Sequence, residues 1–385
     1  MDVLLTDGNE RTALAAARSL VRAGWDVGVA AGGRKLSLAG VSRGVRRFRL
    51  STDPFVDPAG YAAEVGDLVR RFEVRVVLPV TDASVEAILG GRQHMPASAV
   101  VPFPDLETYR AASNKAEILA AARDAGLAVP ETILIEHAEA ALPDRDFFPA
   151  VLKPHRSVIG GRRFGAQFVK TADQCRIALR ELAGLAFPVL LQRRIRGPGE
   201  GLFVLRWDGR VIAEFAHRRL REKPPEGGVS VYRESIALDS ELAAAGRRLL
   251  EELNWQGVAM IECKRDDNSG RHVFMEINGR LWGSLQLAID AGVDFPRLLV
   301  SCALGRRVPP VTQYRVGVRS RWFWGEVDHL YLQLRNGGGF TGKLAALRDF
   351  LRDGFRRKST REEIWRWRDP APFLLESLQQ FGVGR

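Results

Sequence analysis

Two apolar segments in the second half of the chain contain side chains that could bind a metal ion. Glu262 lies within 258–264, and Glu276 and Asn278 lie at the end of the run that begins at Arg271. An Asp-Asp-Asn-Ser-Gly turn joins the segments as a predicted hairpin. Carboxylate and amide oxygens with room for water and phosphate are the donors that Mg²⁺ prefers. These three residues are a predicted magnesium site.

Strand geometry would bring the three side chains to one surface. Alternate residues of a strand share a face, so Glu276 and Asn278 point the same way while Met275 and Ile277 point into the core. The hairpin lets Glu262 join them. The alternative is that each acid caps a turn or faces solvent, but acids inside apolar strands are costly unless paired or metal-bound.

Two of the eight lysines stand where an anion would be expected. Lys115 begins a predicted helix, and Lys153 projects from an apolar run. The loop 157–165 that follows could surround phosphates with its backbone amides. Its candidate residues are Ser157, Gly160 and Gly161. The loop lacks a Walker sequence, and an ordinary hairpin connection is the alternative.

Two further segments could contact a nucleotide or substrate. The run 192–201 is an apolar strand ending in a glycine-proline turn, so it could bind a base at Gln192 and Ile195 and ribose hydroxyls at Glu200, or act as an interdomain hinge. The basic segment 217–228 is expected to be a loop. It offers Arg219 and Arg221 as clamps for carboxylate or phosphate, with a solvated charged loop as the equal alternative. His217 is interpreted as a polar residue at a strand end.

The elements that would position these residues change in type along the chain. The first hundred residues alternate predicted strands with helices, which implies a parallel α/β layer. Their predicted strands are 3–8, 26–31, 74–80 and 99–102, and their predicted helices are 11–23 and 61–72. A small α+β lobe should follow from Asn114, and then a mostly antiparallel sheet. The expected strands of that sheet are 189–195, 201–207, 210–216, 258–264 and 271–277.

The order of these features resembles the ATP-grasp superfamily of carboxylate–amine ligases over about residues 1–310. In that family an acid on one strand and an E-x-N pair on the next hold magnesium, and an arginine soon after contacts phosphate or substrate. Glu262, Glu276, Asn278 and Arg280 match this pattern. The runs 278–284 and 291–296 are similar to the stretch that follows the metal site in carbamoyl phosphate synthetase and biotin carboxylase relatives.

The resemblance also implies roles for the other candidates. Lys115 and Lys153 would contact the nucleotide phosphates, the loop 157–165 would cover them, and Glu200 would bind ribose. Two positions depart from the family pattern. Arg193 stands where many relatives have an acid at the adenine hinge, and Gly279 replaces a frequent proline without removing a ligand.

The fold implied is a doubly wound pre-ATP-grasp domain, a two-lobed ATP-grasp fold and a C-terminal helical appendage. The expected limits are 1–112 for the first domain, 113–188 for the small lobe, 189–310 for the large lobe with the metal site and 311–385 for the appendage. The appendage has 14 basic against 8 acidic residues and four of the eight tryptophans. We expect its tryptophans to pack against the rest of the chain rather than to bind an anionic partner.

The activity implied is ATP- and Mg²⁺-dependent joining of a small carboxylic acid to an amine through an acyl phosphate, with ADP released. Arg280, Lys153 and Arg219 are the expected catalytic residues, since phosphoryl transfer needs positioning and charge neutralisation. Activation of bicarbonate is a weaker alternative, because the sequence has no biotin-carrier motif. A non-catalytic nucleotide-binding scaffold that uses its basic tail for interaction is the other.

Composition limits the remaining classes. The chain has 385 residues, 46% of them hydrophobic, and a net charge of +11, which argues against wholesale disorder. Its arginines are dispersed, so nucleic-acid binding is not expected. Three widely spaced cysteines and an acidic N-terminus favour a reducing cytoplasm, and no apolar run is long enough to cross a bilayer. A homo-oligomer is compatible with the sequence.

Overall fold

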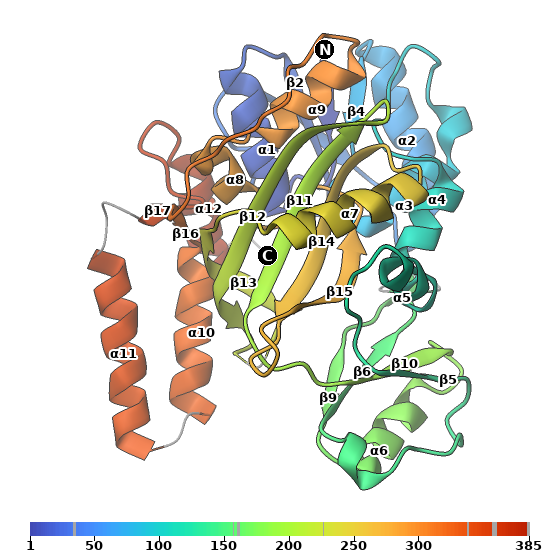
Figure 1. The fold of residues 1–385 in the computed structure, drawn as a ribbon. Helices are drawn as coiled ribbons and strands as arrows, with labels where there is room; N and C mark the ends of the chain where they lie inside the picture. The colour runs from blue at the N-terminus through green and yellow to red at the C-terminus, as the bar shows by residue number, and fades with distance from the viewer. Residues whose placement is uncertain are drawn as a thin grey trace.

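The computed structural model describes residues 1–33, 36–156, 158–159, 162–225, 227–336, 339–355 and 360–382. In Figure 1 the large sheet lies in the centre, the N-terminal part above it and the small lobe below it, with two C-terminal helices on one flank. None of the described helices combines the length and the apolar character needed to cross a membrane.

The N-terminal part is a parallel sheet with the strand order β3-β2-β1-β4, as the alternation of strands and helices predicts. Its strands are β1 (Val3–Leu5), β2 (Val27–Gly32), β3 (Val45–Leu50) and β4 (Val76–Leu78). Its helices are α1 (Arg11–Arg22), α2 (Pro58–Arg71), α3 (Asp82–Gly90) and α4 (Leu106–Ser113), with a 3₁₀ turn η1 (Arg92–His94). The strand expected at 99–102 makes only a single bridge, from Val100 to Val76.

The small lobe has a four-stranded antiparallel sheet in the order β5-β10-β6-β9. Helix α5 (Lys115–Asp124) leads into it, and α6 covers one face (Figure 1). The other elements are β5 (Thr132–Ile135), η2 (Arg145–Phe147), β6 (Ala150–Pro154), β7 (Val158–Ile159), β8 (Arg162–Arg163), β9 (Gln167–Val169), α6 (Ala172–Leu182) and β10 (Val189–Arg193). The β7–β8 hairpin is a separate two-stranded sheet.

The large sheet has the strand order β15-β14-β11-β12-β13-β16-β17. Five of its strands, from β15 to β13, are antiparallel, and α7 (Ser240–Glu252) lies across them (Figure 1). These strands are β11 (Gly199–Trp207), β12 (Arg210–Lys223), β13 (Val229–Ser235), β14 (Gly257–Arg265) and β15 (His272–Asn278). Four of them match predicted strands, but β13 was not predicted, and the strand expected at 189–195 belongs instead to the small-lobe sheet as β10. The prediction that 217–223 belong to a loop is wrong, because these residues extend β12 and pair with β13.

A bulge in the β14–β15 hairpin changes one prediction. Glu262 pairs with Glu276, but the next pair is Cys263 with Phe274, so Met275 is the extra residue. Met275 therefore lines a cavity instead of entering the core. Ile277 is buried in the core, as expected.

The C-terminal end is helical, as predicted, and it also adds strands to the large sheet. β16 pairs with β13, and β17 lies parallel to β16. The elements of this part are α8 (Leu285–Ala291), α9 (Phe295–Ala303), β16 (Arg319–Arg321), α10 (Phe323–Asn336), α11 (Gly339–Phe355), β17 (Thr360–Glu362) and α12 (Ala371–Gln380). The largest core cluster joins side chains of α1, β11, α8 and α9, so the N-terminal part and the large sheet share one core.

Candidate functional site

A cavity of about 800 Å³ lies between the small lobe and the large sheet. Its walls come from α5, β6 and β10 on one side and from β12, β14 and β15 on the other. Most of the site residues predicted from sequence line it. They are Lys115, Lys153, Gln192, Ile195, Arg219, Glu262, Glu276, Asn278 and Arg280.

The three predicted metal ligands lie together on two neighbouring strands. Glu262 and Glu276 are directly paired, and Asn278 follows on the same strand and lines the same cavity. The Asn278 amide lies 3.4 Å from Glu276 Oε1. No group of three or more His, Cys, Asp and Glu side chains suited to a metal occurs in the described ranges, so this set has two carboxylates and one amide. Oxygen donors of this kind fit Mg²⁺.

Both lysines face these carboxylates. Lys115 Nζ lies 3.4 Å from Glu276 Oε2. Burial alone would raise the pKa of Glu276, but Lys115 and Lys153 hold it below its ordinary value. Burial also lowers the pKa of Lys153, an effect that Glu276 opposes. The site therefore combines buried cations with an ionised carboxylate, which suits a phosphate–metal complex.

Arg280 is fixed by an acid that the sequence analysis did not assign to the site. Its Nε and Nη2 each donate to Asp82, at 2.9 Å, and the Tyr109 hydroxyl donates to the same carboxylate at 3.0 Å. Burial would raise the pKa of Asp82, but Arg280 holds it below its ordinary value. Asp82 stands at the start of α3, directly after the capping residue Thr81. That position resembles an ordinary helix start, so sequence alone gave no reason to prefer a role beside Arg280.

Arg219 reaches across the sheet to a predicted metal ligand. Its Nη2 lies 2.6 Å from Glu262 Oε2, and its Nη1 lies 3.1 Å from Glu222 Oε1. Burial would lower the pKa of Arg219, but these two carboxylates raise it above its ordinary value. The crossing needs the absence of a side chain at Gly199, where a Cβ would lie 2.8 Å from Arg219 Cδ.

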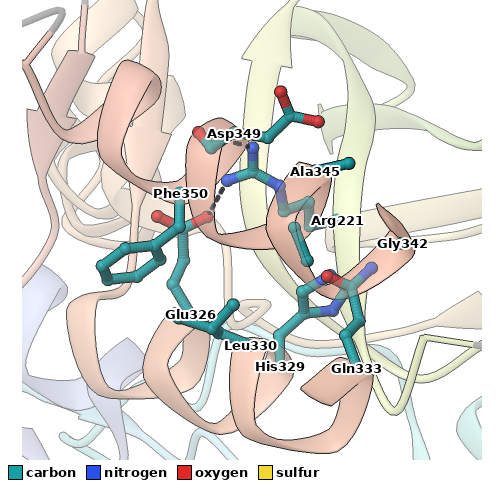
Figure 2. A pocket seen from close by; sticks show the side chains of 10 residues that line it. Arg221, Glu326, His329, Leu330, Gln333, Gly342, Ala345, Asp349 and Phe350 are labelled. Carbon is teal, nitrogen blue, oxygen red and sulfur yellow. Dashed lines mark hydrogen bonds and ion pairs between the residues drawn. The ribbon is translucent and has the colours of Figure 1, made fainter. Parts of the chain in front are cut away.

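Arg221 does not share this site, which corrects its interpretation as a second clamp. The β12–β13 register shifts on both sides of Arg221, so it leaves the cavity face while Glu222 joins it. Arg221 instead lies in a separate cavity of about 280 Å³ between β12, α10 and α11 (Figure 2). There its Nη1 lies 2.5 Å from Glu326 Oε1.

The predicted base-binding segment forms the small-lobe wall of the cavity. Gln192 is buried and donates to Thr132 Oγ1 at 3.1 Å, and Ile195 lies beside it in the wall. Arg193, at the hinge position, pairs with Glu131 at 2.7 Å. Phe168, with the Arg194 guanidinium 4.4 Å from its ring centroid, adds an aromatic surface that the sequence analysis did not identify.

Glu200 is outside this group. It is buried, and its two oxygens are held by Arg218 at 2.7 Å and by His272 at 2.8 Å. It is not among the residues that line the cavity, because β11 alternates and presents Gly199 and Gly201 on the face opposite to Glu200. Its ribose-binding role remains a prediction that this arrangement does not favour.

The phosphate-cover residues Ser157, Gly160 and Gly161 lie outside the described residues. The end of the same loop is described, and Phe164 and Gly165 line the cavity. Lys264 and Trp282 also line it, although the sequence analysis assigned neither to the site. Lys264 lies two residues after Glu262 on β14 and therefore shares its face of the strand. Strand periodicity was thus a usable signal for Lys264.

Comparisons with known proteins agree with this architecture. Residues 187–325 match a family model described as ATP-grasp in the biosynthetic pathway with Ter operon. A search of curated proteins gives no match. The resemblance to ATP-grasp proteins drawn from the sequence is confirmed.

Solved structures show the same fold across most of the chain. The biotin carboxylase of Campylobacter jejuni, in complex with β-γ-ATP, has a TM-score of 0.65 and 17% identity, and covers 83% of this chain and 74% of that chain. The L-amino acid ligase of Bacillus licheniformis has a TM-score of 0.63 and 16% identity, and the match covers 83% of this chain and 78% of that chain. A third structure is the biotin carboxylase domain dimer of Hydrogenobacter thermophilus 2-oxoglutarate carboxylase with MgADP, ADP and bicarbonate. It has a TM-score of 0.64 and 15% identity, and the match covers 83% of this chain and 73% of that chain. The chain therefore has an ATP-grasp fold.

Proposed function

We propose that this protein is an ATP-dependent ligase that activates a small carboxylic acid as an acyl phosphate, releases ADP and joins the acyl group to an amine. The observation that carries the proposal is the meeting of Glu262, Glu276 and Asn278 with Lys115 and Lys153 in one cavity. The family match and the structural likeness to carboxylases and an amino acid ligase support ATP-dependent carboxylate–amine ligation in general.

The residues supply the positioning and charge that phosphoryl transfer requires. Bound Mg²⁺ would offset phosphate charge, and Glu262, Glu276 and Asn278 would hold it. Lys115 and Lys153 lie beside this set and would bind the terminal phosphates. Gln192, Ile195 and Phe168 would contact the base.

The acid would bind on the side of the metal ligands opposite to the nucleotide phosphates. Arg280 is held by Asp82 with one edge of its guanidinium, and Arg219 is held by Glu262 and Glu222. The acid's carboxylate oxygen would attack the terminal phosphorus, breaking the bond to ADP, and Arg280 would offset the developing charge. The amine would then attack the acyl carbon and displace phosphate.

Calorimetric titration of ATP, with and without Mg²⁺, tests the nucleotide site independently of the unknown substrates. We expect magnesium-dependent binding to the wild type and its loss in Glu276→Gln. Glu234→Gln, which removes a carboxylate that pairs with Arg319 outside the cavity, is the matched control. Absence of ATP binding in every condition would overturn the ligase proposal.

A second assay distinguishes the chemistry. With carboxylic acids supplied in a panel, hydroxylamine converts an acyl phosphate to a stable hydroxamate, so the assay needs no knowledge of the natural amine. We expect ADP and hydroxamate to form in equal amounts. AMP and pyrophosphate would instead indicate adenylation, and ADP formation with bicarbonate alone would indicate a carboxylase-like activity.

A further inference from the structure

The cavity wall contains buried polar atoms that have no hydrogen-bond partner among the described residues. They are both ring nitrogens of His217, Trp282 Nε1, Arg219 Nε and Ser230 Oγ. His217 is 1% exposed and Trp282 is 2% exposed. Buried polar groups in folded proteins are nearly always paired, so several unpaired ones in one cavity wall indicate that a ligand pairs with them.

His217 and Trp282 belong to one end of the cavity. The His217 ring lies edge-on to Phe203, with ring centroids 4.7 Å apart, and Trp282 packs on the same phenyl ring at 4.3 Å. Ser230 pairs across β12–β13 with Glu222, well along β12 from His217, so it is not part of this group. The sequence analysis placed His217 at a strand end, but β12 continues to Lys223, so His217 lies inside the strand.

The charged side chains around this end of the cavity disfavour charged ligand groups. The charged groups that act on His217 are Arg219 and Arg233, and both are cationic. Burial and these two guanidinium groups hold the pKa of His217 well below its ordinary value, so the ring is neutral. An ammonium group would be repelled here. The charge of Arg219 is already offset by Glu262 and Glu222, which disfavours a further anion, and its unpartnered Nε can donate to a neutral oxygen.

A neutral oxygen function fits what remains. A neutral imidazole has one donor and one acceptor, and an indole N–H only donates. A hydroxyl or an amide carbonyl can accept from Trp282 and His217 without introducing charge. A hydroxyl or amide N–H can also donate to the remaining acceptors.

We propose that His217 and Trp282 form a neutral subsite that binds a hydroxyl or amide group on the carboxylic acid substrate. This inference rests on the proposed function. His217 and Glu262 lie on opposite sides of β11, each in register with Gly201, so the two positions are about two strand spacings or ~10 Å apart. The side chains of Phe203 and Met260 cover Gly201 between them, and an acid whose carboxylate lies at the metal ligands needs several carbons to reach the subsite.

The test uses straight-chain acids of four to six carbons that differ only in their terminal group, which is methyl, hydroxyl, carboxamide or ammonium. Hydroxamate and ADP formation are measured on the wild type, His217→Phe, Trp282→Phe and Tyr61→Phe. Tyr61 is a matched control, since its hydroxyl is also buried and unpartnered but lies in the N-terminal part. Magnesium-dependent ATP binding is measured on every variant, which separates this inference from the proposed function.

We expect kcat/KM for the hydroxyl or carboxamide acids to exceed that for the methyl acids by ~5- to 10-fold in the wild type. His217→Phe and Trp282→Phe should remove this preference while retaining ATP binding, and Tyr61→Phe should keep it. The inference is overturned if ATP binds but no hydroxyl or carboxamide acid is activated, or if the two cavity variants leave the ranking of acids unchanged. Loss of ATP binding in the wild type would instead defeat the proposed function.

Discussion

At the scale of single residues, the predicted metal ligands are already paired with cations of the chain. Arg219 contacts Glu262, and Lys115 contacts Glu276. A metal ion that binds Glu262 must therefore compete with a guanidinium. This competition links metal affinity to the position of Arg219.

Replacing Arg219 separates its two expected effects. Arg219→Met removes the cation that offsets Glu262, so Mg²⁺ affinity, measured by calorimetry with ADP present, should rise about 3- to 10-fold. Turnover in the hydroxamate assay should fall by at least about tenfold, because a charge near the transferring group is lost. Arg193→Met is the control, since Arg193 lines the same cavity but pairs with Glu131. Weaker Mg²⁺ binding in Arg219→Met would contradict the competition.

Asp82 provides a second prediction, which concerns stability and pH. Asp82→Asn leaves the largely buried Arg280 without its carboxylate partner, so urea unfolding at pH 7 should show a loss of about 1–2 kcal/mol. The folded-state pKa of Asp82 is lowered, so its contribution is present above the ordinary carboxyl pKa of about 3.9 and is lost as pH falls through the lower folded value. The difference between wild type and variant should therefore shrink below about pH 4. Asp67→Asn, in an exposed pair with Arg70, should cost less than about 0.5 kcal/mol. A difference that grows at low pH would contradict the assignment.

At the scale of elements, most apolar strands followed from sequence, but β13 and the irregular positions did not. Apolar runs located the strand cores, and the turn at 266–270 located the β14–β15 hairpin. Met275 was misplaced because a bulge breaks strict alternation, and Arg221 was misplaced for the same reason. The sequence Val-Arg-Arg-Phe-Arg-Leu of β3 has no continuous apolar run, so that edge strand was missed.

The close approach of Arg219 on β12 to Gly199 on the neighbouring strand β11 gives a prediction at this scale. In Gly199→Ala the new Cβ would lie 2.8 Å from Arg219 Cδ, so Arg219 must move away from Glu262. We expect the same fall in turnover as in Arg219→Met, with a loss of about 1–3 kcal/mol in the free energy of unfolding. Gly165→Ala is the matched control, because Gly165 also lines the cavity but its Cβ would meet nothing within 4 Å. Equal turnover in both alanine variants would show that the close approach at Gly199 does not position Arg219.

At the scale of the whole molecule, the segment after β17 connects parts that are distant in sequence. Glu363 is 3% exposed and pairs with Arg11 of α1 and Arg233 of β13. Asp369 pairs with Arg18, also on α1, at 2.8 Å. Ile364, between these acids, belongs to the core cluster that joins the N-terminal part to the large sheet. The C-terminal part therefore stabilises the body that carries the cavity through buried ion pairs, whereas the sequence analysis expected only its tryptophans to pack there.

Truncation before Thr360 tests this connection. The shortened chain would lose the Ile364 packing and leave the fully buried Arg233 without its carboxylate, and losing one partner of a buried pair typically costs about 3–5 kcal/mol. We expect a lower Tm in thermal unfolding and weaker ATP binding, because α1 and the large sheet share a core. Glu363→Gln should reproduce much of the loss in Tm without removing any segment. Trp367→Ala serves as the control, since this side chain is 86% exposed in the same segment and should change stability by less than about 0.5 kcal/mol. An unchanged Tm in both the truncated chain and Glu363→Gln would show that the cavity-bearing body folds independently of its C-terminal segment.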